Sequence, residues 1–151
     1  MTSGDLIGMT GFHLTFTPVL RPSGRAGVSA MGKLTGCVSP NGLHSELLSG
    51  VISATGKAEA HPVDSRPLGA LRSAGGKGTI MWSPTRARSR FSWSMSISPV
   101  KAEIAFSATI TGGKLNGDTV MAGPVLVRVK PGLGDGGLGG LSTDLAVVVF
   151  G

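Results

Sequence analysis

The chain has no tyrosine, a single cysteine and only 8 acidic residues among 151. Because one cysteine can neither close a disulfide within the chain nor build a cysteine-based zinc site, both of these stabilising devices are excluded. Cys37 is expected to be a small buried residue in a strand, with pairing between two molecules as the alternative. Stability must then come from an apolar core, which a chain of this length can form as one domain over residues 1–151.

Long apolar runs are also missing. No stretch reaches the roughly 18 apolar residues of a membrane-spanning helix, so no transmembrane segment is predicted. The first residues lack the basic and apolar regions of a signal peptide. We therefore expect either a cytoplasmic protein or the mature form of a secreted one with a starting methionine.

Charge is sparse and one-sided, with 14 basic residues, a net charge of +6 and a pI of about 10.3. Such a balance raises nucleic acid or another anionic partner as a possibility. The basic residues are spread along the chain, however, and the aromatic motifs of RNA-binding sheets are missing. Nucleic acid is therefore not expected as the partner.

Catalytic motifs are missing as well. The nucleophile elbow Gly-x-Ser-x-Gly does not occur, so a serine hydrolase has no support. His13, His44 and His61 lie in separate segments, with no carboxylate at a metal-ligand spacing. We predict no catalytic residues, no metal and no cofactor.

What the chain has in abundance is alternation between apolar and polar residues. Phe91, Trp93, Met95 and Ile97 alternate with serines, which is the period of a strand with one buried face. Both tryptophans, Trp82 and Trp93, fall on apolar positions and are expected in the core. The same reasoning predicts strands at Phe12–Thr17, Val28–Val38, Leu47–Ala60, Gly78–Ser83, Phe91–Ser98, Ala102–Ile110, Thr119–Met121, Val125–Lys130 and Leu141–Phe150.

Turn residues separate these strands. Asn41-Gly42 is a turn signal, and Gly32 and Gly36 inside a predicted strand mark a bulge or a close backbone approach. Pro18–Gly27, His61–Gly76 and Pro131–Gly140 are predicted as loops. The final apolar run is predicted to be a strand buried on both faces, either in the middle of a sheet or paired with the first strand to close a barrel. The fold class is all-β, an antiparallel sandwich or barrel of roughly 8–10 strands.

Arg86, Arg88 and Arg90 occupy alternate positions between the tryptophans and should share one face where the hairpin is extended. They could be solvated charges that discourage edge pairing, or a contact for an anionic partner. We take Arg86, Arg88 and Arg90 with Trp82 as the candidate binding residues; core packing is the expected role of Trp82, but were it exposed, a tryptophan beside arginines would suit a sugar or protein partner.

Two segments carry a family resemblance. Gly78–Ser83, followed by Thr111–Thr119 with its Gly-Asp-Thr element, resembles a family of small secreted glycine- and threonine-rich β-domains of actinobacteria, over roughly Leu34–Phe150. The resemblance implies an extracellular location and no particular activity. Family members carry a signal peptide and a second cysteine in the late Pro/Gly segment, whereas Pro131–Gly140 contains no cysteine.

The leading hypothesis is a non-enzymatic secreted β-domain that binds another macromolecule, as a component or adaptor of an extracellular assembly, with a protein or a second copy as partner. One alternative is a small barrel that carries an apolar ligand, which requires a large cavity lined by Trp93, Met95, Ile104 and Phe106. The other is a hydrolase, which requires His44 or His61 to meet a carboxylate in a cleft.

Overall fold

The computed structural model describes residues 4–20, 24–61, 71–98, 103–126, 128–131 and 138–151. Over these ranges every regular element is a β-strand. No helix among the described residues is long and apolar enough to span a bilayer. The strands are β1 (Leu6–Leu20), β2 (Arg25–Val38), β3 (Ser49–His61), β4 (Leu71–Ser83), β5 (Arg88–Ser98), β6 (Glu103–Gly113), β7 (Thr119–Leu126), β8 (Arg128–Pro131) and β9 (Leu138–Phe150).

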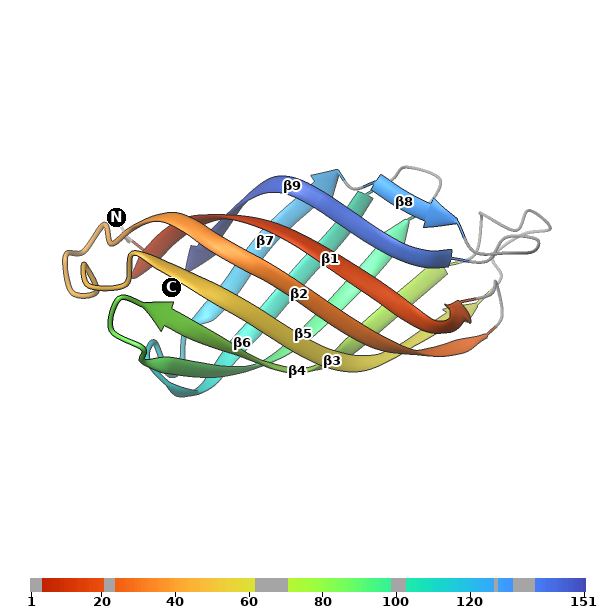
Figure 1. Ribbon diagram of the computed structural model, residues 1–151, viewed down its shortest axis with the longest axis horizontal. Helices are drawn as coiled ribbons and strands as arrows, with labels where there is room; N and C mark the ends of the chain where they lie inside the picture. Colours follow the sequence, from red (N-terminus) through yellow and green to blue (C-terminus); the bar gives the residue numbers. More distant parts are fainter. Residues whose placement is uncertain (1–3, 21–23, 62–70, 99–102, 127, 132–137) are drawn as a thin grey trace.

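The strands form an antiparallel meander that closes on itself (Figure 1). Each strand from β1 to β6 pairs with the next along the chain, and β9 pairs with both β7 and β1. Strand β8 follows β7 along the same side of β9, since β7 pairs with the end of β9 and β8 with its beginning. The described chain is therefore a closed barrel with eight positions around the ring. The predicted all-β class is confirmed, and of the two positions predicted for the last strand, the one paired with the first strand is observed.

Side chains alternate between the barrel interior and its outer wall. On β5, Phe91, Trp93 and Met95 are buried, whereas Ser94 and Ser96 are exposed. The predicted phase of this strand is confirmed, and both tryptophans are buried as expected. Because an antiparallel strand with one wet face alternates in this way, the apolar half of each strand fills the inside of the barrel.

Glycine makes room for the largest interior side chains. Gly56 of β3 pairs directly with Gly76 of β4, and the Trp93 indole lies over them from β5. A Cβ on Gly56 would lie 2.9 Å from Trp93 Cζ2 and would also meet the carbonyl of Gly75. Gly78 makes room for the Phe91 ring in the same way. Aromatic rings thus cover a glycine-lined stretch of wall, where any larger residue would clash.

Three other glycines have the roles expected for them. Gly36 has a φ of 58° and lies where the pairing of β1 and β2 shifts register, so it marks a bulge. Gly32 lies close to the neighbouring strand, because a Cβ there would be 2.8 Å from the Gly11 carbonyl oxygen. Gly42 has a φ of 74° in the turn after Asn41. These positions confirm the turn and bulge predictions.

Sequence predictions need correction in several places, among them the loop predicted at Pro131–Gly140, whose last residues belong to β9 from Leu138. Leu71–Gly76 is the first half of β4 and not a loop. Its inward positions Ala74 and Gly76, which pair with Met95 and Trp93, are too small to give an apolar alternation; residues 62–70 lie outside the described chain. The loop predicted at Pro18–Gly27 is shorter, since β1 extends to Leu20 and β2 begins at Arg25. The last strand is buried on one face only: Val147 and Val149 are 55% and 40% exposed.

One end of the barrel is closed by a compact plug. Trp82 is fully buried there, and its ring meets that of Phe150 edge to face at 5.8 Å. The Trp82 indole Nε1 donates a hydrogen bond of 2.8 Å to Ser89 Oγ, which in turn donates one of 2.6 Å to the Lys114 carbonyl. Leu47 and Leu115, from the turns at this end, are also buried. The plug therefore satisfies the polar atom of its tryptophan while burying its ring.

We expect Ser89→Ala to destabilise the barrel by about 1–3 kcal/mol, because it leaves the buried indole N–H of Trp82 without a partner. Urea unfolding of the variant would measure this loss. Ser96→Ala, an exposed serine on the same strand, is the matched control and should change stability by less than about 0.5 kcal/mol. Equal effects of the two substitutions would contradict the role assigned to Ser89.

Candidate functional site

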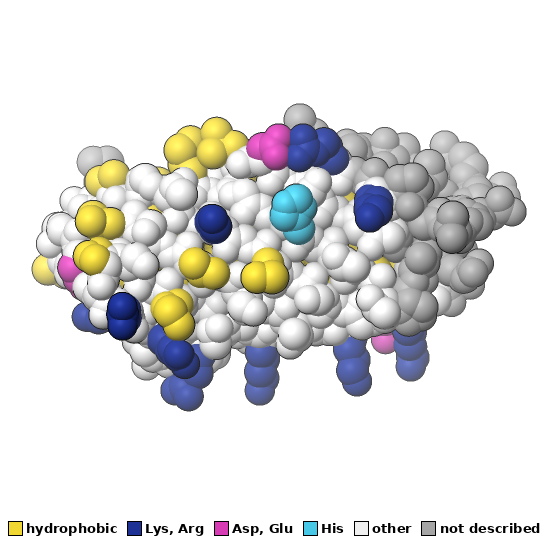
Figure 2. Space-filling model, viewed as in Figure 1, with side chains coloured by type: hydrophobic (Ala, Val, Ile, Leu, Met, Phe, Trp, Pro, Cys, Tyr) yellow, Lys and Arg dark blue, Asp and Glu magenta, His cyan; other side chains and the backbone are white. Residues whose placement is uncertain are grey.

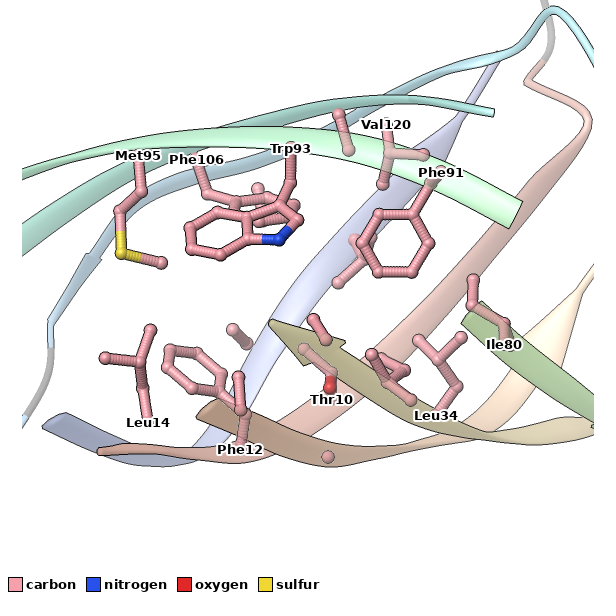
Figure 3. A pocket seen from close by; sticks show the side chains of 18 of the residues that line it. Thr10, Phe12, Leu14, Leu34, Ile80, Phe91, Trp93, Met95, Phe106 and Val120 are labelled. Atoms are coloured by element: carbon pink, nitrogen blue, oxygen red, sulfur yellow. The ribbon is translucent and has the colours of Figure 1, made fainter. Parts of the chain in front are cut away.

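The middle of the barrel contains a cavity of about 100 Å³. Figure 3 shows side chains converging on it from opposite walls, with Trp93, Met95 and Phe106 on one side and Phe12 and Leu14 on the other. The cavity extends along the barrel from the Met95 and Leu14 end to Ile80 and Leu34 (Figure 3). It lies between the plug and the far half of the barrel, where Phe16, Leu20 and Leu141 fill the interior.

Several inward-facing side chains border this cavity without being fully buried. Phe12, Ile52 and Phe106 occupy interior positions of their strands, yet each is only partly buried. Their neighbours two residues away on the same face are buried. Since these side chains point into the barrel and line the cavity, their residual exposed surface indicates open space inside.

The cavity wall is almost entirely apolar. Thr10 carries the one hydroxyl group among its lining side chains, and this makes a long 3.4 Å hydrogen bond to the Gly11 carbonyl. The Trp93 indole Nε1 is already directed to the Thr55 carbonyl oxygen at 3.3 Å, and its ring stacks on Phe106 at 6.5 Å. The cavity therefore offers contact surface to hydrocarbon and one hydroxyl to anything polar.

The four residues predicted to line an apolar cavity all do so: Trp93, Met95, Ile104 and Phe106. The predicted large size is wrong, because about 100 Å³ is below the roughly 300 Å³ at which small-molecule pockets usually begin. The reason is that an eight-stranded barrel is only about wide enough for its own side chains, and aromatic side chains from opposite walls occupy much of its interior. Sequence alternation identified the lining residues, but it contains no information on the space left between them.

The candidate binding residues separate into two environments. Arg88 and Arg90 are exposed on the outer wall of β5, and Arg86 is exposed in the β4–β5 turn with a φ of 59°. Trp82 is fully buried in the plug, so it presents no surface to an external partner. The binding role of the arginines stays a prediction. Two of them, Arg88 and Arg90, belong to a surface that also includes residues from other strands.

A shallow hollow on the outer wall lies beside Arg90. It is bordered by Lys77 of β4 and by hydroxyl side chains from β3 to β6, namely Ser53, Thr55, Thr79, Ser92 and Thr111. The Arg90 guanidinium lies against Gly112, where a Cβ would be 2.5 Å from Arg90 Nη2. Two cations and several hydroxyl groups therefore surround one depression, a combination that sequence spacing could not reveal.

The residues that could hold a metal do not come together. Among the described residues, no group of three or more His, Cys, Asp or Glu side chains is placed to bind a metal ion. His13 is exposed and His44 half-buried, while nothing is described of the His61 side chain. Cys37 is a buried free thiol, and burial raises its pKa. Its position agrees with the small buried residue predicted there.

A pair of carboxyl groups joins the start of the chain to the β6–β7 turn. Burial, and then interaction with Asp5, raises the pKa of Asp118 to about 6, against the opposing charge of His44. The pKa of Asp5 is lowered, first by its hydrogen bond with Asp118 and also by the Asn41 amide, whose Nδ2 lies 2.5 Å from Asp5 Oδ1. Below about pH 6 Asp118 therefore holds a proton, which it can donate to the Asp5 carboxylate.

This carboxyl pair has no part in either hollow, since none of its residues lines the cavity or the outer depression. His44 acts on both carboxyl groups through its charge. The cluster ties the first residues to the closed end of the barrel, where Asp5 N donates to the Phe150 carbonyl at 2.8 Å. We therefore assign it a structural role.

Comparison of the chain with protein-family models, with curated proteins and with solved structures found no match.

We expect Asp118→Asn to raise thermal stability at neutral pH. The pKa of Asp118 is higher in the folded protein than the ordinary value of 3.8, so its contribution to stability is present at low pH and is lost as the pH rises through about 6. The asparagine can still donate a hydrogen bond to Asp5 but carries no charge. Melting curves from pH 4 to 8 should show the variant gaining on the parent as pH rises.

Asp144→Asn is the control for this experiment. Its bidentate hydrogen bonds with Arg128, at 2.8 and 2.7 Å, lower the pKa of Asp144. Its removal should therefore cost stability near neutral pH and become neutral in acid, the opposite trend. Parallel pH profiles for Asp118→Asn and the parent protein would rule out the shared proton.

Proposed function

We propose that the protein is a non-enzymatic binding protein whose barrel holds a slender apolar ligand. The observation that carries the proposal is the cavity inside the closed barrel, with apolar lining on all sides and a single hydroxyl from Thr10. Eight-stranded barrels are wide enough to hold one small ligand when side chains do not fill them completely. Binding would bury hydrocarbon that is otherwise in contact with water.

The size and shape of the cavity limit the ligand. An apolar cavity of about 150 Å³ is known to admit benzene, and this one is smaller, at about 100 Å³. Because the lining extends along the barrel axis, a straight alkyl or unsaturated chain fits better than a ring. The ligand class that follows is a short hydrocarbon chain or the chain end of a larger lipid, with any polar group near Thr10.

A second function, binding of another macromolecule, is supported by an apolar patch on the outer wall. The patch combines side chains of three adjacent strands, with Val149 of β9 paired to Ile7 of β1 and to Met121 of β7. Each member is between 37% and 60% exposed, which is unusual for neighbouring large apolar residues. The patch consists of Ile7, Met9, Met121, Leu145, Val147 and Val149.

The occupant proposed for this patch is a second copy of the chain. The patch is centred on β9, which lies opposite β4 in the ring whether one counts through β1 or through β7. The exposed cations Lys57, Lys77 and Arg90 are on β3, β4 and β5. A net charge of +6 opposes self-association, but two copies that meet patch to patch would keep these like charges far apart. The proposal retains the extracellular location implied by the family resemblance.

The interior site can be tested with protein labelled with ¹³C on the methionine methyl groups. Adding n-hexane should shift the Met95 methyl resonance in a saturable way, because Met95 lines the cavity. Met9 and Met121 are exposed on the outer wall and should not move. Cyclohexane, which is wider, should bind more weakly. Absence of a Met95 shift, or equal shifts of all methyl groups, would contradict the proposal.

Ala108→Leu provides the matching variant, because Ala108 is the partner of Trp93 on the neighbouring strand and lines the cavity. The larger side chain should reduce hexane affinity by about tenfold or more, or cost about 1–3 kcal/mol of stability if the barrel cannot accommodate it. Ala105→Leu adds the same atoms to an exposed position of the same strand and should leave hexane binding unchanged. Identical behaviour of the two variants would place the hexane outside the cavity.

Self-association can be tested by light scattering during size-exclusion chromatography. The parent protein should elute with the mass of a dimer at micromolar or higher concentration, and Val147→Glu should elute as a monomer because it buries an unpaired charge. Val51→Glu changes a similarly exposed valine outside the patch and should remain dimeric. A monomeric parent protein at millimolar concentration would overturn this second function while leaving the interior site untouched.

A further inference from the structure

A line of cations crosses the outer wall on the side opposite the apolar patch. Lys57 of β3 pairs with Gly75 of β4, two residues from Lys77, and Lys77 pairs with Ser92 of β5, two residues from Arg90. From β3 to β5, each cation is displaced by two residues along the sheet relative to the one before it, in the same direction both times. The three side chains therefore form a straight diagonal over adjacent strands. Diagonal neighbours of this kind lie about 7–8 Å apart. We call Lys57, Lys77, Arg88 and Arg90 the basic stripe.

The cations of the basic stripe have no ion-pair partner among the described residues, and an ion pair lies beyond each end of the stripe. Its four members are exposed, and within the described chain none of them forms an ion pair. Beyond one end, Arg25 lies 3.6 Å from Glu59, and beyond the other, Lys114 lies 3.5 Å from Glu46. Figure 2 shows Lys and Arg side chains projecting side by side along one edge of the molecule. Four free cations in a row give that wall a concentrated positive potential.

The wall between these cations is polar and carries hydroxyl groups. The hollow beside Lys77 and Arg90 is bordered by Thr55, Thr79 and Ser92, among others. Gly112 leaves the space that the Arg90 guanidinium occupies beside this hollow. An anionic group could be held there by the fork of an arginine and the point charge of a lysine, with hydroxyl groups nearby to bond its neutral oxygens.

We propose that the basic stripe binds a linear acidic polysaccharide, whose repeated carboxylate or sulfate groups lie along the row while its hydroxyl groups meet those of the hollow. The alternative polyanion, single-stranded nucleic acid, is bound through aromatic rings that stack on bases. In the described chain every phenylalanine and tryptophan faces the interior: Phe12, Phe16, Phe91, Phe106 and Phe150 with Trp82 and Trp93. The stripe therefore offers charge and hydroxyl groups without a stacking surface, which favours a sugar.

The basic stripe uses neither the cavity nor the apolar patch, so polysaccharide binding there is independent of the interior ligand and of self-association. It extends the arginine prediction from sequence, since Arg88 and Arg90 belong to the stripe. Their partners Lys57 and Lys77 lie on other strands and reach them only through the sheet register.

The test is titration of the full chain with dextran sulfate and alginate at low ionic strength, with neutral dextran as the uncharged polymer. The parent protein should bind both acidic polymers and not dextran, with an affinity that falls steeply with added salt. The double variant Lys77→Gln and Arg90→Gln should lose about tenfold or more in affinity. Lys33→Gln with Lys130→Gln removes the same charge from exposed positions outside the stripe and should lose less than about threefold.

Three other outcomes would overturn the proposal. Equal losses of affinity in the two double variants would mean that the polymers are attracted by the net charge of the protein and not by a defined site. Tighter binding of single-stranded poly(dT) than of either polysaccharide would make nucleic acid the partner, and binding only to vesicles with anionic lipid would make it a membrane surface. Unchanged melting temperature and an unchanged Met95 response to hexane would show that the stripe variants are folded and retain the interior site.

Discussion

The pairing of β1 with β9 is the interaction on which the rest of the structure depends. It runs from Leu6 against Phe150 to Leu20 against Leu138, with two register shifts, and joins the first strand to the last. Without it the meander would be an open curved sheet with two long unpaired edges, a form prone to association with other chains. With it, the apolar faces of all strands meet around one axis, and the interior becomes an enclosed space instead of a groove.

How much of that space stays empty depends on the distribution of side-chain size. Gly56, Gly76 and Gly78 form a thin stretch of wall, and the rings of Trp93 and Phe91 lie over it. The alanines at 54, 108, 122 and 146 line the remaining hollow without reaching across it. A barrel built from leucine and isoleucine at these positions would be a packed core. The cavity is therefore a property of small residues placed between large ones, and it lies where the aromatic rings leave a gap.

Sequence reasoning worked where a strand carried its own signal. The serine alternation from Phe91 to Ile97 identified both the strand and the phase of its buried face, and the paired Asn41 and Gly42 identified a turn. It failed at Leu71–Gly76, where the inward positions Ala74 and Gly76, beside Met95 and Trp93, are too small to alternate visibly with polar residues. It failed again at Leu145–Phe150, because a continuous apolar run reads as buried on both faces, while here Val147 and Val149 belong to an exposed patch. The basic stripe was only half visible, since Lys57, Lys77 and Arg90 are neighbours by register and not by spacing.

The position of the two chain ends has a mechanical consequence. Asp5 and Phe150 are joined by a backbone hydrogen bond of 2.8 Å, and both ends of the described chain lie at the plugged end of the barrel. A force that pulls these ends apart acts across the seam between β1 and β9 and loads its hydrogen bonds one after another, beginning at Leu6 and Phe150. The seam would open like a zipper, in contrast to strands pulled along their length, whose hydrogen bonds share the load. The β1–β9 pairing, which protects the sheet from association through its edges, is thus also where the barrel is expected to open when its ends are pulled apart.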